Sequence, residues 1–288
     1  MPVILRRSRW TTKPKIRDPE LDFAHPLSAG LVGAWILGLA PASAMLRDLS
    51  GNGNHGTLLG SSISRVNYRG GRALFFNGDG NTDRYDLGPI DSANPLCLTG
   101  DVLTFVAGFR LQQSGLGNTF PRVFDKSDGA GLVNGYGFYI DDGVGDDYRF
   151  DVNGTSYGSD TLTGNEKYRY HIACVTQDGS TLTFFKEVGD QTNFGQVGGT
   201  NAIPSATTNA AIGNWNHTTD RNWHGYIDFV YLWDRVLDLG ARRAIQNNPY
   251  QFVQPRLSGR TYVAYGITAQ PPPRGDTGKG SIVIAIAP

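Results

Sequence analysis

Glutamate is scarce in this sequence: three of its 26 acidic residues, Glu20, Glu166 and Glu187, are glutamates, and the others are aspartates. Aspartate favours turns over helix interiors, so the bias argues against a helical protein. The 26 acidic residues balance 26 lysines and arginines, for a formal net charge of zero. A chain without net charge has no overall field to attract nucleic acid or an acidic membrane, and we expect neither partner.

Cysteines are few and long apolar runs are missing. The two cysteines, Cys97 and Cys174, make neither a disulfide framework nor a zinc motif. We expect Cys174 to be a buried free thiol, with a Cys97–Cys174 disulfide as the alternative. No segment approaches the roughly 20 apolar residues of a membrane span. The N-terminus also lacks the features of a signal peptide, so we expect synthesis in the cytoplasm of a host cell.

Glycine and aromatic residues are plentiful instead. The chain has 38 glycines in 288 residues, and aromatics make up 11%. Many glycines without a collagen period indicate tight turns, and aromatics suit strands with one buried face. Residues 101–111 show the period of two that a strand requires, with apolar side chains at every second position. Short strands separated by Gly and Asn turns predict an all-β jelly-roll sandwich.

Two hairpins, a long strand and one helix stand out in the second half. Residues 135–140 pair with 146–154 in the first predicted hairpin, and residues 168–189 form the second around an Asp-Gly turn. The segment 224–237 predicts a strand with Ile227, Phe229, Tyr231 and Trp233 on its apolar face. Asp238 can cap a short helix over residues 239–247, which Pro249 then ends.

The two ends differ from the predicted sandwich, residues 30–256. Residues 1–29 are rich in proline and basic residues and predict an extended arm that lies on a partner, with a solvated, partly disordered tail as the alternative. The residues of the arm that we expect to contact this partner are Arg6, Arg7, Arg9 and Trp10. Residues 257–288 contain a Pro/Gly linker and an apolar strand at 281–287, which we expect to pair with this domain or a neighbouring chain.

The segments GLVGAWILG, DLSGNGNHGTL and GRALFFNG near the start, and HGYIDFVYLWDRVLDLGARRAIQNNPYQFVQP near the end, resemble laminin G-like jelly rolls of the concanavalin A-like superfamily. The resemblance covers roughly residues 29–255 and implies an antiparallel sandwich with one short C-terminal helix. The leader RRSRWTTKPKIRDPELDFAHPLSAGLVGAW and the closing NPYQFVQPR are similar to phage and prophage virion proteins that carry such a domain. This second resemblance implies a structural role on a phage particle.

The glucanase branch of this superfamily places two glutamates on one strand, as Glu-x-Asp-x-x-Glu. Here no two glutamates lie close together in sequence. Glycoside hydrolysis needs two carboxyl groups flanking the scissile bond, so we expect no enzyme activity.

Many members of the superfamily hold calcium near the opening turn. Asp48, Asn52 and Asn54 in that turn, with Asp228 from the last long strand, are the candidate ligands. The alternative is a turn in which Asp and Asn bond their own backbone.

A sugar-binding loop is the third candidate, because lectin sites place an aromatic ring against the sugar with polar groups beside it. The loop 214–226 contains Trp215, Asn216, Asp220, Arg221 and Trp223. Exposed tryptophans indicate a binding surface. The alternative is that the two tryptophans close the end of the sandwich.

Our leading hypothesis is a non-enzymatic phage virion protein, a capsid-decorating or head-associated component that attaches to capsid or other virion proteins through its terminal arms. We also expect it to form a homo-oligomer. The first alternative is a glycan- or receptor-binding module of a tail fibre, with the 214–226 loop as its site. The second alternative is a glycan-active enzyme.

Overall fold

The computed structural model describes residues 19–39, 45–68, 71–78, 83–98, 102–112, 120–128, 133–141, 147–158, 168–179, 181–186, 193–198, 208–215 and 221–255. The chain divides after Arg256 into two compact units, and all described residues belong to the first. The predicted partner-binding residues Arg6, Arg7, Arg9 and Trp10 and the predicted strand 281–287 lie outside these ranges.

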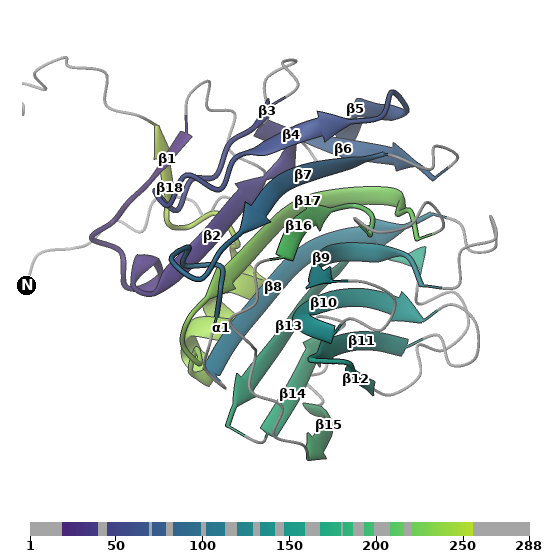
Figure 1. Ribbon diagram of the computed structural model, residues 1–288. Helices are drawn as coiled ribbons and strands as arrows, with labels where there is room; N and C mark the ends of the chain where they lie inside the picture. The colour runs from purple at the N-terminus through teal and green to yellow at the C-terminus, as the bar shows by residue number, and fades with distance from the viewer. Residues whose placement is uncertain are drawn as a thin grey trace, which may run out of the picture. The chain divides into compact units, whose positions relative to one another are not determined.

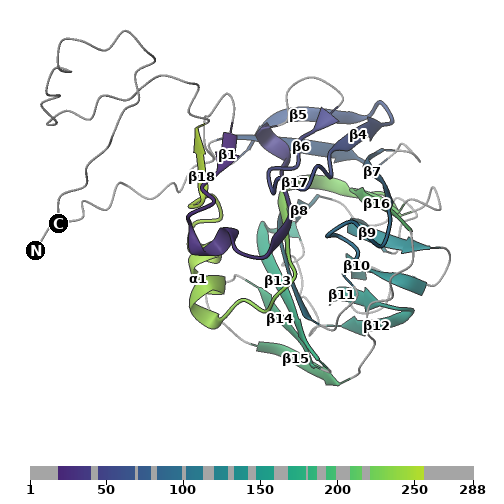
Figure 2. The same ribbon diagram turned by 60° about the vertical axis from the view of Figure 1, so that its left-hand side comes forward.

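Two antiparallel sheets face each other and form a sandwich (Figures 1 and 2). The strands of the first sheet are β3 (Met45–Leu46), β4 (Gly56–Leu59), β7 (Arg84–Ile90), β9 (Arg122–Asp128), β10 (Val133–Asp141), β11 (Asp147–Val152), β12 (Thr155–Gly158) and β16 (Thr208–Ile212). Their order across the sheet is β12-β11-β10-β9-β16-β7-β4-β3. Four of the seven neighbouring pairs are consecutive strands, whereas β9-β16, β16-β7 and β7-β4 join strands that are separated by others in the chain, as in a jelly roll.

The strands of the second sheet are β2 (Leu31–Ile36), β5 (Ile63–Tyr68), β6 (Gly71–Asn77), β8 (Val102–Leu111), β13 (His171–Asp178), β14 (Thr181–Lys186), β15 (Asn193–Gly198) and β17 (His224–Trp233). Their order is β15-β14-β13-β8-β17-β6-β5. Strand β2 lies off this order, because it pairs with the second half of β17, Phe229–Trp233, whereas β6 pairs with the first half, His224–Ile227. A separate two-stranded ribbon joins β1 (Pro19–Leu21) to β18 (Val253–Pro255). Short 3-10 helices span Pro26–Ser28 and Leu37–Leu39.

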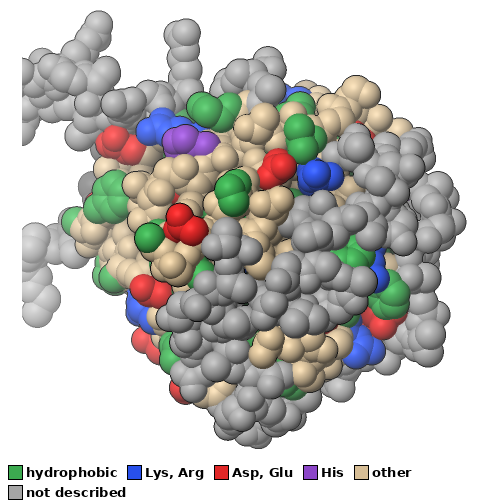
Figure 3. Space-filling view, in the orientation of Figure 1, with side chains coloured by type: hydrophobic (Ala, Val, Ile, Leu, Met, Phe, Trp, Pro, Cys, Tyr) green, Lys and Arg blue, Asp and Glu red, His purple; other side chains and the backbone are tan. Residues whose placement is uncertain are grey.

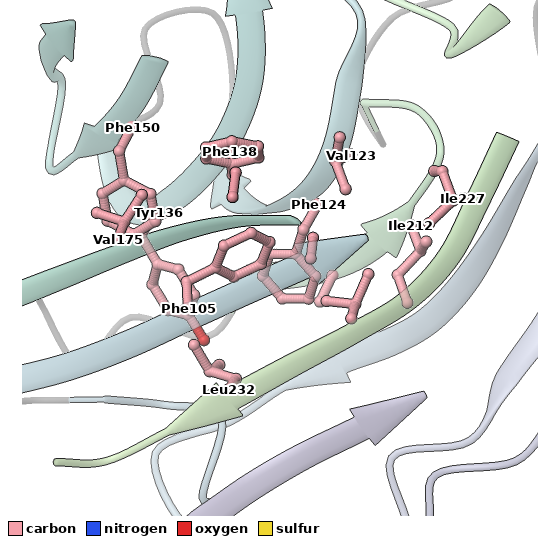
Figure 4. Close-up of a cluster of buried hydrophobic side chains, with 14 of the residues drawn as sticks. Phe105, Val123, Phe124, Tyr136, Phe138, Phe150, Val175, Ile212, Ile227 and Leu232 are labelled. Carbon is pink, nitrogen blue, oxygen red and sulfur yellow. The ribbon is translucent and has the colours of Figure 1, made fainter. Parts of the chain in front are cut away.

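Aromatic and aliphatic side chains fill the space between the sheets (Figure 4). Strand β8 contributes the alternating set that the sequence predicted: Leu103, Phe105, Ala107, Phe109 and Leu111, all fully buried. Burying one such large apolar side chain stabilises the fold by roughly 1.5–3 kcal/mol. The prediction of an antiparallel all-β sandwich of the jelly-roll kind is confirmed.

A second core lies on the other face of the second sheet. There α1 (Leu239–Asn247), β1 and β18 cover the sheet (Figure 2). Ile245 of the helix is fully buried in this core. The Trp233 indole N–H donates to the Leu27 carbonyl at 2.7 Å and so ties the N-terminal segment to β17.

Residues 19–29, which the sequence assigned to the extended arm, are part of the folded body. Pro19 pairs with Pro255, and Leu21 with Val253. Leu21 and Leu27 are buried in the second core. Proline is tolerated here because β1 is an edge strand of a short ribbon rather than a central strand.

The two predicted hairpins are present. Strands β10 and β11 pair from Tyr136–Val152 to Asp141–Asp147. Strands β13 and β14 pair up to Asp178–Thr181, and Gly179 has the positive φ, 56°, that the turn requires.

The prediction for β17 was wrong in two respects. The strand ends at Trp233 and not at residue 237. Phe229, Tyr231 and Trp233 lie in the second core, but Ile227 lies between the sheets with Val230 and Leu232. An irregularity in the pairing with β8 between Ile227 and Phe229 shifts the register by one residue. Both faces of the strand are buried, so its sequence carries no single apolar face.

Both cysteines are buried free thiols, as predicted for Cys174, and the alternative disulfide is absent. Burial raises the pKa of the Cys174 thiol to about 12. None of the helices in the described ranges has the length and hydropathy needed to cross a membrane.

The predicted helix and its cap are confirmed, and the cap gives a first test. The Asp238 side chain accepts the Ala241 N–H at 2.7 Å. We expect Asp238→Ala to lower the free energy of unfolding by about 0.5–2 kcal/mol, because one N-terminal N–H loses its acceptor. Asp238→Asn keeps an acceptor and should lose much less. Urea denaturation of both variants checks this, and equal losses would show that the cap is not the cause.

Candidate functional site

A row of polar side chains crosses the outer face of the first sheet. Because Tyr136, Phe138 and Ile140 point into the core, the side chains between them on β10 point outward. Pairing places Asp125 of β9 opposite Gly137, and Gly137 opposite Asp151 of β11. The outer face therefore carries two aspartates in one row with a glycine between them.

Gly137 leaves space that a larger residue would fill. A Cβ added there would lie 3.1 Å from the Asp125 carboxylate. Glycine inside a strand weakens the strand and often marks a close approach of another group. Ser156 of β12 continues the row beyond Asp151.

Arg122 lies at the centre of this face and is fully buried. Its guanidinium stacks 3.8 Å from the centre of the Tyr139 ring. Arg122 Nη1 lies 3.7 Å from Asp151 Oδ2, and Nε lies 3.8 Å from Asp125 Oδ2. These gaps exceed a direct hydrogen bond.

Neither Nε nor Nη1 of Arg122 has a hydrogen-bond partner in the part of the chain that the structure describes. Two nitrogens of a buried cation that lack hydrogen bonds are costly. A polar contact longer than about 3.5 Å points to an intervening oxygen, from water or from a ligand hydroxyl. The guanidinium is therefore the feature of this face that points most directly to a binding site.

Tyr139 connects Arg122 to β11 and β12. Its hydroxyl donates to Asp151 Oδ1 at 3.0 Å and shares a 2.9 Å hydrogen bond with the Ser156 hydroxyl. Burial, and next the negative charge of Asp151, raise the pKa of Tyr139 to about 12. The phenol stays protonated at neutral pH and acts as a donor. Burial also raises the pKa of Asp151, against the opposing effect of Arg122.

Aromatic rings and a second arginine extend the cluster toward the sheet centre. The Arg221 guanidinium lies 4.2 Å from the Trp215 ring centre and 5.2 Å from that of Phe120. Phe120 meets the Tyr139 ring edge to face at 5.9 Å. Cation–π contacts of this kind favour a fixed stacking order.

Ser127 links this stack to the polar row. The Trp215 indole N–H points to the Ser127 hydroxyl at 3.4 Å, and this hydroxyl donates to Asp125 Oδ1 at 2.8 Å. The aromatic stack and the aspartates are thus parts of one network.

A second ion-paired group lies farther along β10 and β11. Arg149 contacts Asp147 at 3.0 Å and Asp141 at 3.4 Å, and its side chain is 29% exposed. Burial raises the pKa of Asp147 despite the neighbouring Arg149. We call the outer-face cluster the set Phe120, Arg122, Asp125, Ser127, Tyr139, Asp141, Asp147, Arg149, Asp151, Ser156, Trp215 and Arg221.

The structure separates the residues of the predicted sugar-binding loop. Trp215 and Arg221 belong to the outer-face cluster. Trp223 is buried in the inter-sheet core against Phe109 instead. Asn216 and Asp220 lie outside the described residues. Trp215 is only 2% exposed, so neither tryptophan offers an open ring face.

Sequence reasoning missed Arg122, Tyr139 and Asp151 as a group. Asp147, Arg149 and Asp151 do alternate with Tyr148, Phe150 and Val152 in the sequence, as in a strand with one polar face. Which residues of β9 and β10 join them depends on register between strands, which the sequence does not display.

The predicted calcium ligands hold a turn together. Asp48 Oδ1 accepts the Ala34 and Ser50 N–H groups at 3.0 and 2.9 Å. Its Oδ2 accepts the Asn54 N–H and the Ser50 hydroxyl at 3.1 and 2.8 Å. Asn52 Nδ2 donates to the Val32 carbonyl at 3.1 Å. This pattern fits the alternative reading, an Asp/Asn turn bonded to its own backbone.

Asp228, the fourth predicted ligand, is a buried residue of β17. Within the described residues, no group of three or more His, Cys, Asp or Glu side chains is placed to hold a metal ion. Calcium at this turn stays a prediction.

Comparison with known proteins supports the fold. A family model described as the concanavalin A-like lectin/glucanases superfamily matches residues 79–239. A solved structure of Trypanosoma rangeli sialidase in complex with sialic acid is 14% identical with a TM-score of 0.55. The similarity covers 78% of this chain and 34% of the sialidase chain, so this chain spans about a third of that enzyme.

Domain 4 of an extracellular arabinanase from Geobacillus stearothermophilus, in complex with arabinotriose, is 16% identical with a TM-score of 0.53. Here the similarity covers 75% of this chain and 98% of that domain. At these identities the likeness shows the fold alone. No curated protein matches the sequence.

The raised pKa of Asp151 gives a pH test. Its ordinary value is 3.8, and burial raises it in the folded protein. Because its pKa is higher in the folded than in the unfolded protein, Asp151 makes its full contribution to stability below the unfolded-state pKa. That contribution is lost as the pH rises through the folded-state pKa. From about pH 4 upward, wild-type protein should therefore lose stability relative to Asp151→Asn.

Urea midpoints of the two proteins across this pH range measure the difference. Asp178→Asn, at an exposed turn, is the matched control for loss of one carboxyl group. If wild type instead gains stability relative to Asp151→Asn as pH rises, ion pairing with Arg122 outweighs burial and the prediction fails.

Proposed function

We propose, on the premise that this chain belongs to the concanavalin A-like lectin/glucanases superfamily, that its sandwich binds a glycan on the outer face of the first sheet without hydrolysing it. The observation that carries the proposal is the buried Arg122, whose Nε and Nη1 lack hydrogen-bond partners within the described residues.

Sugar recognition requires donors and acceptors close together, beside an apolar surface. A sugar hydroxyl can accept from a guanidinium and donate to a carboxylate at the same time. The outer-face cluster offers both groups around Arg122. Phe120 and Arg221 are half-buried and Ser156 is exposed, so they form the accessible part of the cluster, while Arg122 and Tyr139 support it from beneath.

One similar structure is consistent with this proposal. The arabinanase domain was solved in complex with arabinotriose. The arabinanase domain is matched over almost its whole length, so a stand-alone domain of this architecture can carry a sugar.

The carboxylates favour binding over turnover. Glycosidases position one carboxyl group as a proton donor and a second as nucleophile or base. Asp125 and Asp151 instead both lie close to one buried guanidinium, at 3.8 and 3.7 Å. Two carboxylates that share one buried arginine act as its charge partners, which supports binding rather than hydrolysis.

Substitution of the accessible residues tests the site. Phe120→Ala and Arg221→Ala should each weaken glycan binding by about tenfold, the usual effect of truncating an interface anchor. Glycan arrays identify a ligand, and calorimetry measures its affinity. Arg169→Ala, at an exposed position away from the cluster, is the control and should bind normally.

If both cluster variants kept the wild-type affinity for the glycan, the sugar would bind at another site. Release of reducing sugar from the bound glycan would contradict the non-catalytic assignment.

A second role, attachment to a phage particle, is favoured by the ribbon of β1 and β18. Because Pro19 pairs with Pro255, residues 1–18 and the segment after 255 start from neighbouring points on the body. We propose that these segments fasten the domain to capsid or other virion proteins, as the resemblance of the leader to phage virion proteins implies. The sandwich is then the exposed body of a homo-oligomeric virion component.

Removal of residues 1–18 tests this role. The truncation leaves β1 intact, so the body should keep its unfolding free energy and its glycan affinity. We expect sedimentation with bare phage capsids to be lost in the truncated protein and kept in the full chain. Equal sedimentation of both proteins, or of neither, would refute attachment through this arm.

A further inference from the structure

We infer that the glycan bound by the outer-face cluster is a neutral oligosaccharide, free of carboxylate and sulfate groups. The inference rests on the proposed function, because it concerns the same site. Its basis is that two of the three arginines of the cluster, Arg122 and Arg149, are ion-paired with aspartates of the same face.

Two carboxylates balance the charge of Arg122. Its Nε and Nη1 lie 3.8 and 3.7 Å from Asp125 and Asp151. Arg122 is fully buried, so a bound sugar would lie above it, on the accessible residues of the cluster. An anionic group held there would lie near two poorly solvated carboxylates, where repulsion between like charges is strong, and the charge of Arg122 is already balanced by them.

Arg149 repeats the arrangement at the more exposed end of the cluster. Asp147 and Asp141 lie 3.0 and 3.4 Å from its guanidinium, and the two carboxyl side chains are 9% and 12% exposed. Charge at this end is screened more by solvent, but an acidic sugar still meets two carboxylates beside the one cation.

Arg221 is the third arginine of the cluster. Its guanidinium lies 4.2 Å from the Trp215 ring centre and 5.2 Å from that of Phe120. These cation–π contacts hold it against the two rings, and its charge belongs to the same face as the aspartates.

The charges of the cluster give no excess of cation. The cluster contains three arginines and four aspartates, Asp125, Asp141, Asp147 and Asp151. The formal net charge of the whole chain is zero. On the face drawn in Figure 3, the coloured acidic and basic side chains are interspersed, and those drawn form no broad basic area. Long-range attraction of an acidic glycan is therefore not expected from the described residues.

Matched sugars test the inference on the full chain. Calorimetry would compare oligogalactosides with oligogalacturonates of equal length, and lactose with 3′-sialyllactose. We expect the neutral member of a bound pair to bind about tenfold or more tightly than the acidic one. Tighter binding of the acidic members would overturn the inference and leave the proposed function standing. Binding of no sugar in this panel or on a glycan array would overturn the proposed function itself.

Asp141→Asn supplies a second measurement that does not depend on the ion pairs of Arg122. The variant removes one carboxylate beside Arg149, whose side chain is 29% exposed, and keeps a side chain of the same size at the buried position 141. The ratio of acidic to neutral affinity should rise by a factor of about two to five, the scale of one exposed ion pair. Asp178→Asn is the control for loss of one negative charge. The same ratio in Asp141→Asn as in wild type would contradict discrimination by these aspartates.

Discussion

The packing of Phe105 is the contact on which the rest of the site depends. From β8 of the second sheet, its ring contacts Phe138 at 5.1 Å, Phe124 at 5.8 Å and Phe150 at 6.2 Å. These three partners come from β10, β9 and β11, the strands that carry the central part of the outer-face cluster. Because side chains alternate along a strand, fixing one face of these strands also fixes which polar side chains meet on the other.

Much of the fold could be predicted because its signals are local. The cap at Asp238, the helix that follows it, and the Asp-Gly turn before Thr181 each depend on a few neighbouring residues. The alternation along β8 can be recognised from the sequence of that strand alone. The error in β17 has the same physical origin, because a one-residue irregularity after Ile227 depends on its partner strand and leaves no mark in a strand whose two faces are both apolar.

The site could be predicted only in part because it depends on contacts between distant segments. Trp215 and Trp223 have similar neighbours in sequence, yet one joins the outer face and the other the core. Tyr139 meets Arg122 because β9 and β10 pair with an irregular register between Phe138 and Tyr139. In the calcium prediction, the residues of the opening turn were correctly seen as a cluster. Their donors and acceptors, however, are occupied by backbone and side chains of the same region.

The ribbon of β1 and β18 has a mechanical consequence. Its pairing puts Pro19 beside Pro255, so a load that separates the two ends of the body acts first on these three residue pairs and peels them open one after another. The sandwich strands carry no tension until the ribbon has opened. A force that pulls both ends together against the outer face of the first sheet acts differently, because it is transmitted through the whole sandwich. The domain is then expected to yield early to one direction of pull and to resist the other.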